Sequence, residues 1–238
     1  MGCGTGRANL RRALTGVALV ALAACARAPS SSPTPGPATG PIDSRRPLPS
    51  PLPRIAATVN GQPILIEHVA LAARQAQAKA QDRSQPDPGA LRGALQRLIV
   101  RELFLQEALV RGVRADARVV ERFYDAERSR HGSATEWHVF LSNQGLSDDD
   151  FRAELRVQAT VEALQRQVAA EIDPAAFSED EVRAFYAAHP ELSRSQPPRP
   201  YEDMAELTRA ALAQLRAAEH VQALAKTLEA RARIEVFL

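Results

Sequence analysis

Nine of the chain's 17 prolines lie in the 29 residues from Ala26 to Arg54, and this concentration limits where a folded domain can form. Proline lacks the backbone N–H that helices and central strands use, so such a stretch favours an extended conformation. The same stretch shows no apolar periodicity, which is typical of a spacer. We therefore expect residues 25–54 to be a tether and residues 55–238 to form one folded domain.

The residues before the tether have the composition of an export signal. Three arginines occur without any acidic residue, and an apolar run follows from Leu14 to Ala24. This run is about half of the roughly 20 residues that span a bilayer, which favours a cleaved signal over a membrane helix. It ends in Leu22-Ala-Ala-Cys25, which resembles the lipobox of bacterial lipoproteins. The resemblance implies a signal over residues 1–24 and a lipid-modified Cys25; the alternative is an ordinary signal followed by a chance cysteine.

Charge and cysteine content exclude several classes of function. Without the predicted signal, 27 basic and 28 acidic side chains remain, a net charge of −1, which argues against nucleic-acid binding. Cys3 would be lost with the signal and Cys25 would carry lipid, so no disulfide or thiolate metal site is expected. In the lipoproteins that this segment resembles, an Asp directly after the lipidated cysteine favours the inner membrane. This chain has Ala26 at that position. We therefore expect a periplasmic protein that contacts a membrane, the outer rather than the inner, only through its lipid anchor.

Apolar residues at about 100° per residue predict that most of the domain is helical. We expect helices at residues 88–111 and 115–130, from Ser147 to the stop at Asp173-Pro174, and at residues 178–189 and 202–230. In the first helix the predicted apolar face consists of Leu91, Leu95, Leu98, Ile99, Leu105 and Leu109. In the last helix it consists of Met204, Leu207, Ala211 and Leu215.

Short strands are predicted at both ends of the domain. Residues 55–59 lead into the turn pair Asn60-Gly61, and residues 233–237 alternate between polar and apolar. Because an isolated hairpin is only marginally stable, we expect the terminal strands to pair with each other. The predicted fold is mainly α, with five to seven helices closed by a long C-terminal helix and a small sheet.

Several segments along the domain carry a family resemblance. They are Val59-Asn-Gly-Gln-Pro-Ile64, Leu98-Ile-Val-Arg-Glu-Leu-Phe-Leu-Gln-Glu-Ala108 with Arg111-Gly-Val113, Glu136-Trp-His-Val-Phe-Leu141 through Gly145-Leu-Ser-Asp-Asp-Asp-Phe-Arg152, Ser178-Glu-Asp-Glu-Val-Arg-Ala-Phe-Tyr-Ala-Ala-His-Pro190, Pro200-Tyr-Glu-Asp-Met204 and Ala232-Arg-Ile-Glu-Val-Phe237. In this order they resemble the chaperone part of the SurA, PrsA and PpiC-type family of extracytoplasmic folding factors. Members with a parvulin-type prolyl isomerase carry that domain before the last helix, whereas seven residues join Leu192 to Pro200 here. No catalytic residue can therefore be carried over.

The resemblance implies a SurA-like helical domain that binds non-native polypeptides without ATP and without covalent chemistry. Clients would lie in a crevice between the N-terminal helices and the long C-terminal helix. The residues expected to line it are Glu102, Phe104, Phe123, Trp137, Phe140, Phe185 and Tyr186. By default the aromatic residues are core, with about a third of them lining a cleft, and Glu102 more often pairs with an arginine or reaches water at the edge of the apolar face.

Other functions are less well supported by the residues. The five histidines form no i, i+4 pair with an acidic partner, so we expect neither a metal site nor a cofactor. One alternative to the chaperone is a lipoprotein that grips a single partner during envelope assembly. Another is a prolyl isomerase, which conflicts with the short connection before Pro200. An exposed apolar cleft lined by aromatic side chains would favour the chaperone over the single-partner protein.

Overall fold

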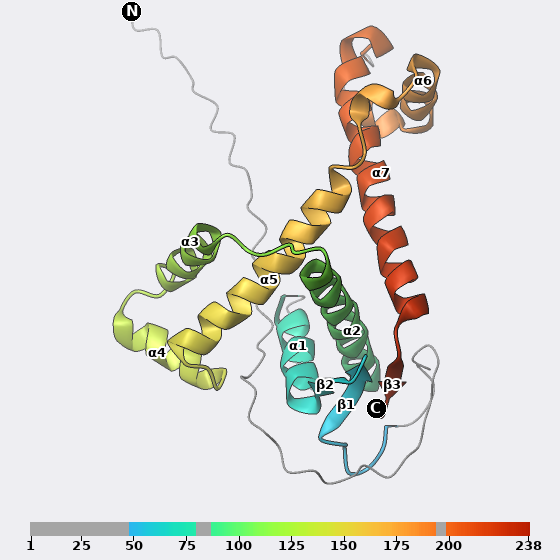
Figure 1. Cartoon of the computed structure of the whole chain (residues 1–238). Helices are drawn as coiled ribbons and strands as arrows, with labels where there is room; N and C mark the ends of the chain where they lie inside the picture. Colours follow the sequence, from blue (N-terminus) through green and yellow to red (C-terminus); the bar gives the residue numbers. More distant parts are fainter. Residues whose placement is uncertain (1–47, 80–86, 194–198) are drawn as a thin grey trace, which may run out of the picture.

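A computed structural model of the chain describes residues 48–79, 87–193 and 199–238. These residues form seven α-helices, two short 3-10 turns and a three-stranded antiparallel sheet. α6 and the N-terminal part of the long helix α7 extend away from the rest of the molecule (Figure 1). The predicted signal, Cys25 and the tether up to residue 47 lie outside the described residues. Within those residues, no helix has both the length and the apolar character that crossing a membrane requires.

The sheet joins the two ends of the domain, as the alternating patterns predict. β1 (Ile55–Val59) lies between β2 (Gln62–Leu65) and β3 (Ile234–Val236), and both pairings are antiparallel. The β1–β2 turn uses positive φ angles at Asn60 (51°) and Gly61 (86°), which asparagine and glycine adopt most readily. The Asn60 side chain also accepts a hydrogen bond of 2.8 Å from the backbone N–H of Arg233, which fixes the start of β3.

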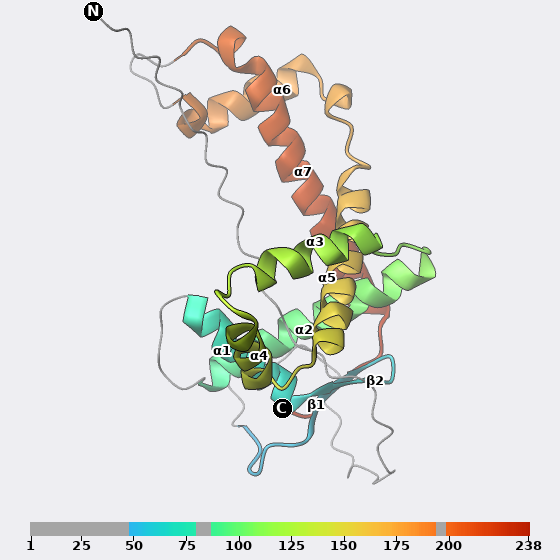
Figure 2. The same ribbon diagram turned by 90° about the vertical axis from the view of Figure 1, so that its left-hand side faces the viewer.

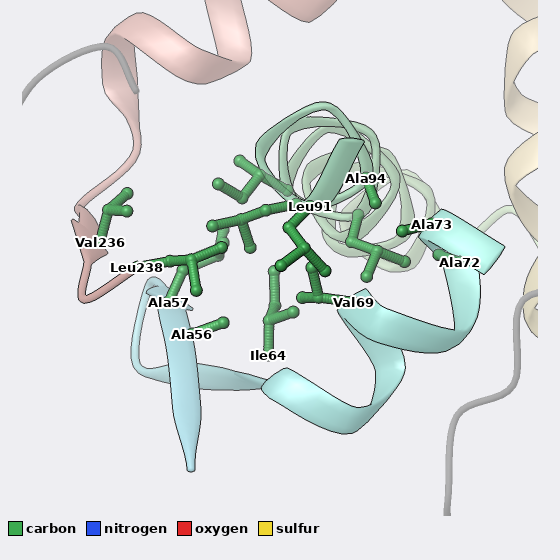
Figure 3. Packing of buried hydrophobic residues seen from close by; sticks show 14 of the residues in the cluster. Ala56, Ala57, Ile64, Val69, Ala72, Ala73, Leu91, Ala94, Val236 and Leu238 are labelled. Carbon is green, nitrogen blue, oxygen red and sulfur yellow. The ribbon is translucent and has the colours of Figure 1, made fainter. Parts of the chain in front are cut away.

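α1 (Ile66–Lys79) and α2 (Pro88–Val110) cover the sheet and form the largest core cluster (Figure 3). α2 begins at Asp87, whose side chain accepts a 2.6 Å hydrogen bond from the backbone N–H of Ala90. Leu91, Leu95, Leu98 and Ile99 are buried against the sheet, as predicted. Leu48 also packs against this cluster, so packing begins seven residues before the predicted boundary at Ile55.

α3 (Ala117–Arg128), α4 (Ala134–Asn143) and the first half of α5 (Asp148–Ala169) surround a second, aromatic cluster. α5 begins with a capping box in which Ser147 and Asp150 bond each other's backbone N–H groups. Its second half crosses α2 and α7 in Figure 1, where a third cluster contains Phe104, Leu164 and the half-buried Leu224. α2 and α5 are also joined by a buried ion pair of 2.5 Å between Arg101 Nη2 and Glu154 Oε1.

α6 (Glu179–Ala188) lies between the 3-10 turns at Pro174–Ala176 and Pro190–Ser193 and packs on the first half of α7 (Tyr201–Arg231). Val182, Tyr201 and Leu212 are the buried centre of this arm, which is our name for residues 174–193 and 199–219. The predicted apolar face of α7 was partly wrong: Met204 is buried, but Leu207 is 56% and Leu215 is 42% exposed. α6 lies against a neighbouring face of α7, where Tyr201, Thr208 and Leu212 are buried.

Candidate functional site

Large aliphatic side chains are exposed at three places on the described helices: one pair on α2, one pair on α7, and Val139 alone on α4, which is 53% exposed. Leu109 and Val110 lie in the last turn of α2 and are 59% and 82% exposed. Leu207 and Leu215 lie on the part of α7 that belongs to the arm. Large aliphatic side chains in helices are usually turned toward a core, so these positions are candidates for contact with another molecule.

The exposure of Leu109 follows from the length of α2. Leu109 lies at the same angular position on the helix as Leu91, which is buried against the sheet. α2 continues past the elements that cover the face carrying Leu91 and Leu109. The last turn of α2 therefore has no partner on that face. The helix ends at Arg111, and Gly112 reverses the chain with a φ of +70°. Val113 N–H then donates to the carbonyl of Ala108 at 2.8 Å.

Charged side chains fix the end of α2 against α5 and α7. Arg111 Nε lies 2.6 Å from Glu107 Oε1, and Arg111 Nη1 lies 3.8 Å from Glu171 Oε1. His220 on α7 forms a 2.8 Å contact with the other carboxylate oxygen of Glu171, just beyond α5. Leu109 and Val110 are therefore presented by a helix end that contacts two other helices. These surface ion pairs contribute little to stability individually, but together they orient the three helices.

Trp137, Phe140 and Phe123 belong to the cluster between α3, α4 and α5. Trp137 is 2% exposed, and its indole Nε1 donates a 2.9 Å hydrogen bond to Asp148 Oδ1. Phe140 stacks on Trp137 with ring centroids 5.3 Å apart, and Phe123 is half-buried beside them. Phe104 is 2% exposed in the cluster between α2, α5 and α7. The prediction that Trp137 and Phe104 face a client is wrong for this conformation, because both fill gaps between helices.

Phe185 and Tyr186 are half-buried on α6, in the arm. The Phe185 ring packs on His189 at 4.0 Å, and Tyr186 OH donates a 2.6 Å hydrogen bond to the carbonyl of Arg199. This bond links the end of α6 to the residues just before α7. The seven candidates are thus divided among four places: the sheet layer, the aromatic cluster, the cluster between α2, α5 and α7, and the arm. The structure does not bring them together.

Glu102 lies at the end of the first cluster, where α2 passes beneath the β1–β2 turn. Its Oε1 accepts a 2.8 Å hydrogen bond from Gln106 Nε2, which also donates to the carbonyl of Val59 at 3.2 Å. Gln106 Oε1 in turn accepts from Asn60 Nδ2 at 2.8 Å. Burial raises the pKa of Glu102 above its ordinary value, and the bond from Gln106 and the charge of Arg101 oppose this only in part. The carboxylate therefore belongs to a polar network that joins α2 to the sheet.

The predicted crevice between the N-terminal helices and α7 is filled along the second half of α7. Val221, Leu224 and Ala225 pack against Phe104 and Leu164 there. Gln96 Nε2 also donates a 2.7 Å hydrogen bond to Glu229 Oε1 across the same interface. No group of three or more metal-binding side chains occurs within the described residues. What these residues offer to a ligand is exposed aliphatic surface at the end of α2 and along the first half of α7.

The sequence pattern missed this surface because it treats every periodic leucine as buried. Leu109, Leu207 and Leu215 were assigned to apolar faces that pack, and Val110 was not singled out. Which of these side chains are exposed depends on how far each helix extends beyond the elements that cover it. No local pattern in the sequence indicates this length.

Comparison with known proteins identifies the family. A family model described as the SurA-like N-terminal domain matches residues 42–165, which is just over half of the chain. The match begins within the second half of the predicted tether and extends nearly to the end of α5. No curated protein matches the chain. The region matched includes the sheet hairpin, the long helix α2 with its exposed end, and the aromatic cluster. The chain belongs to the SurA-like N-terminal domain family.

Proposed function

We propose that this protein is an ATP-independent, chaperone-like lipoprotein that transiently binds non-native polypeptides in the periplasm. Membership of a chaperone-type family supports the general class. The observation that carries the proposal is the exposed aliphatic surface at Leu109 and Val110, on a helix end held by ion pairs. Apolar contacts are not directional, so such a surface can bind many sequences and release them without covalent chemistry.

The binding mode that we propose is holding. Clients would cover the last turn of α2 with their own apolar segments, which would keep those segments from associating with each other. Because all eleven aromatic residues are described and none is exposed, the contacts from this protein would be aliphatic. This differs from the aromatic-lined cleft expected from the sequence.

Suppression of aggregation tests the proposal. An outer-membrane protein diluted from urea should aggregate more slowly when a near-stoichiometric amount of this protein is present, as measured by light scattering. Leu109→Gln with Val110→Gln should remove most of the effect, and Leu52→Gln, a change at another exposed leucine, should not. Unchanged aggregation with several clients would reject the holding role.

A lipoprotein that grips one envelope partner is the second candidate. The absence of any exposed aromatic side chain favours it, because promiscuous binding was expected to use such residues. The two functions differ in their client range: the single-partner protein would fail to protect unrelated unfolded proteins and would co-purify with one partner at a fixed ratio.

We also propose that Cys25 carries lipid and that the protein is anchored to the outer membrane. The lipobox-like residues before Cys25 support this. Residues 26–47, which precede the packed Leu48, could at about 3.1 Å per residue when extended hold the domain roughly 70 Å from the membrane. Metabolic labelling with a fatty acid should mark the protein, and Cys25→Ser should abolish the label. Membrane fractionation then distinguishes the outer from the inner membrane.

We further propose that the protein is not a prolyl isomerase. The short connection between α6 and α7 supports this. The end of α6 is also joined to the start of α7 by the hydrogen bond from Tyr186 to Arg199 and by the 3.5 Å ion pair between Arg183 and Glu202. A proline-peptide assay should give the uncatalysed rate, and activity above background would contradict the proposal.

A further inference from the structure

The first half of α7 has a face that no described element covers. α6 packs against Tyr201, Thr208 and Leu212, and the chain before α6 contacts Arg209. This part of α7 extends beyond the body together with α6 in both views (Figures 1 and 2). Leu207 and Leu215 project from it with 56% and 42% of their surface exposed.

Two parallel rows of residues, each with a spacing of four, make up this open face of α7. The first row has carboxylates at both ends and aliphatic side chains between them. It consists of Asp203, Leu207, Ala211, Leu215 and Glu219. The second row consists of Glu206, Ala210, Gln214, Ala218 and Gln222. The face thus combines two exposed leucines with three carboxylates and contains no cation, in a chain with 28 arginines.

Three arginines of the arm form ion pairs, and one of these pairs involves a carboxylate of the open face. Arg209 Nη1 donates a 2.6 Å hydrogen bond to the carbonyl of Phe177 and Nη2 lies 3.3 Å from Glu179. Arg183 contacts Glu179 as well as Glu202. Arg216 lies 2.8 Å from Glu219 and neutralises part of one end of the face.

The arm, together with the adjoining residues 171–173 and 220, holds ten acidic and four basic side chains. This part of the molecule therefore has an excess of negative charge. Asp203 and Glu206 form no ion pair within the described residues, and they flank Leu207. Their charges are exposed and act over a screening length of about 8 Å at 0.15 M salt. A ligand that seats apolar groups on Leu207 and Leu215 therefore places its neighbouring groups in a negative field.

We infer that the open face of α7 binds polypeptide segments that combine aliphatic residues with flanking lysine or arginine. The inference rests on the proposed function and specifies which segments the arm selects. The leucines provide apolar contact area, and the carboxylates favour cations beside it and repel anionic segments. A second copy of the chain would bring the same carboxylates against each other, and an anionic membrane surface would be repelled as well.

Three fluorescent peptides test the inference with the protein purified as its host cell makes it. They share one leucine-alanine core and one length, and their flanking residues are lysine, glutamine or glutamate. Fluorescence anisotropy should give at least tenfold tighter binding of the lysine peptide than of the glutamate peptide. The difference should shrink severalfold between 0.05 and 0.5 M salt.

Variants locate the binding to this face. Leu207→Gln with Leu215→Gln should weaken the lysine peptide at least fivefold, and both positions are exposed enough to tolerate the change. Glu206→Lys should reduce the preference for lysine over glutamate. Asp125→Lys on α3 makes the same charge change at an exposed site outside the arm, and should leave both affinities unaltered.

The outcomes separate this inference from the function on which it rests. Equal affinity for the three peptides, or an affinity that the α7 variants do not change, would overturn the inference. The proposed function of polypeptide binding would remain supported in that case. Failure of the protein to bind any peptide or to slow aggregation rejects both. Self-association that disappears in the Leu207→Gln variant assigns the face to a second copy and also overturns the inference.

Discussion

Asp148 connects two side chains of the aromatic cluster. Its Oδ1 accepts hydrogen bonds from Tyr124 OH and from Trp137 Nε1, and the guanidinium of Arg152 lies 3.7 Å from the centre of the Tyr124 ring. The bond from Tyr124, and then that from Trp137, lowers the pKa of Asp148 below its ordinary value. A carboxyl whose pKa is lowered by folding stabilises the protein above its unfolded pKa, and this contribution is lost as the pH falls through the folded pKa.

Asp148→Asn should therefore destabilise the protein at pH 7 by about 1–2 kcal/mol, the typical size of hydrogen bonds to a charged group. The difference from the wild type should begin to shrink below about pH 4, where the carboxyl of the unfolded chain becomes protonated, and should go on shrinking as the pH falls through the lower pKa of the folded form. Urea unfolding at pH 7 and pH 3 measures both values. Asp149→Asn is the matched control, because Asp149 occupies the same first turn of α5 and is exposed; an equal loss from both substitutions would contradict the account.

Glu102 has the opposite pH dependence. Because burial raises its folded pKa, its protonated form stabilises the fold below the unfolded pKa, and this contribution is lost as the pH rises through the folded pKa. Glu102→Gln removes the charge and keeps an oxygen that can accept from Gln106. We expect the variant to be more stable than the wild type at pH 8, by about 0.5–1 kcal/mol, and equally stable at pH 3.

Thermal unfolding followed by circular dichroism at pH 3 and pH 8 tests this. Glu107→Gln, five residues further along α2, is the control, because its carboxylate pairs with Arg111 and no gain is expected. A lower stability of Glu102→Gln at pH 8 would show that the ionised carboxylate stabilises the fold.

At the level of single residues, the sequence predicted the polar residues at which helices begin better than it predicted which aromatic side chains are exposed. Ser147 and Ser178 cap the helices that the sequence predicts to begin there, and such a start can be predicted because capping depends on neighbours three residues away. Trp137 and Phe104 were expected in a binding crevice and are buried. Their burial depends on α5 crossing two other parts of the chain, which no local pattern encodes.

Among the elements, α2 and α5 are joined by the ion pair between Arg101 and Glu154. The Glu154 side chain is 0% and the Arg101 side chain 15% exposed, so both charges are largely removed from water. Removing one partner of a buried pair leaves the other charge uncompensated, whereas replacing both with apolar residues can be neutral.

Glu154→Met should cost about 3 kcal/mol of stability, and the double variant Arg101→Met with Glu154→Met should recover most of it. Denaturant unfolding of the two single variants and the double variant closes the cycle. Strictly additive losses would contradict the account, since they would mean that the two charges do not interact.

The long helix α7 shows what periodicity predicts about an element and what it does not. Its length was expected almost to the residue, since the helix runs over Tyr201–Arg231 against a prediction of 202–230. Its buried face was only partly correct, because Met204 is buried and Leu207 is exposed. An alanine-rich helix has several moderately apolar faces, and the position of α6 determines which of these faces is buried. α4 was not predicted as a separate helix, because its ten residues contain too few turns for a clear period.

The molecule as a whole consists of a well-packed body and a thin arm. The largest cluster joins the sheet, α1 and α2, whereas the cluster between α6 and α7 has three buried side chains. The terminal strands pair as predicted, which could be expected because both are too short to be stable alone. The extension of the arm could not be predicted, since it depends on where α7 leaves the body.

Local opening should follow this difference in packing. Backbone amides in α6 and the first half of α7 should exchange with deuterium at least tenfold faster than those in β1 and the middle of α2. Hydrogen exchange followed by mass spectrometry measures this directly. Equal protection in the arm and the body would mean that the molecule opens as one unit.

Selective binding to the unfolded form of a polypeptide tests the central claim most directly. A protein that stays unfolded when its disulfides are reduced and blocked can be titrated against its native, disulfide-bonded form, with affinity measured by fluorescence anisotropy. We predict measurable binding of the unfolded form alone, weakened by Leu109→Gln with Val110→Gln. Binding of neither form, or equal binding of both, would contradict the account of this protein as a holder of non-native chains.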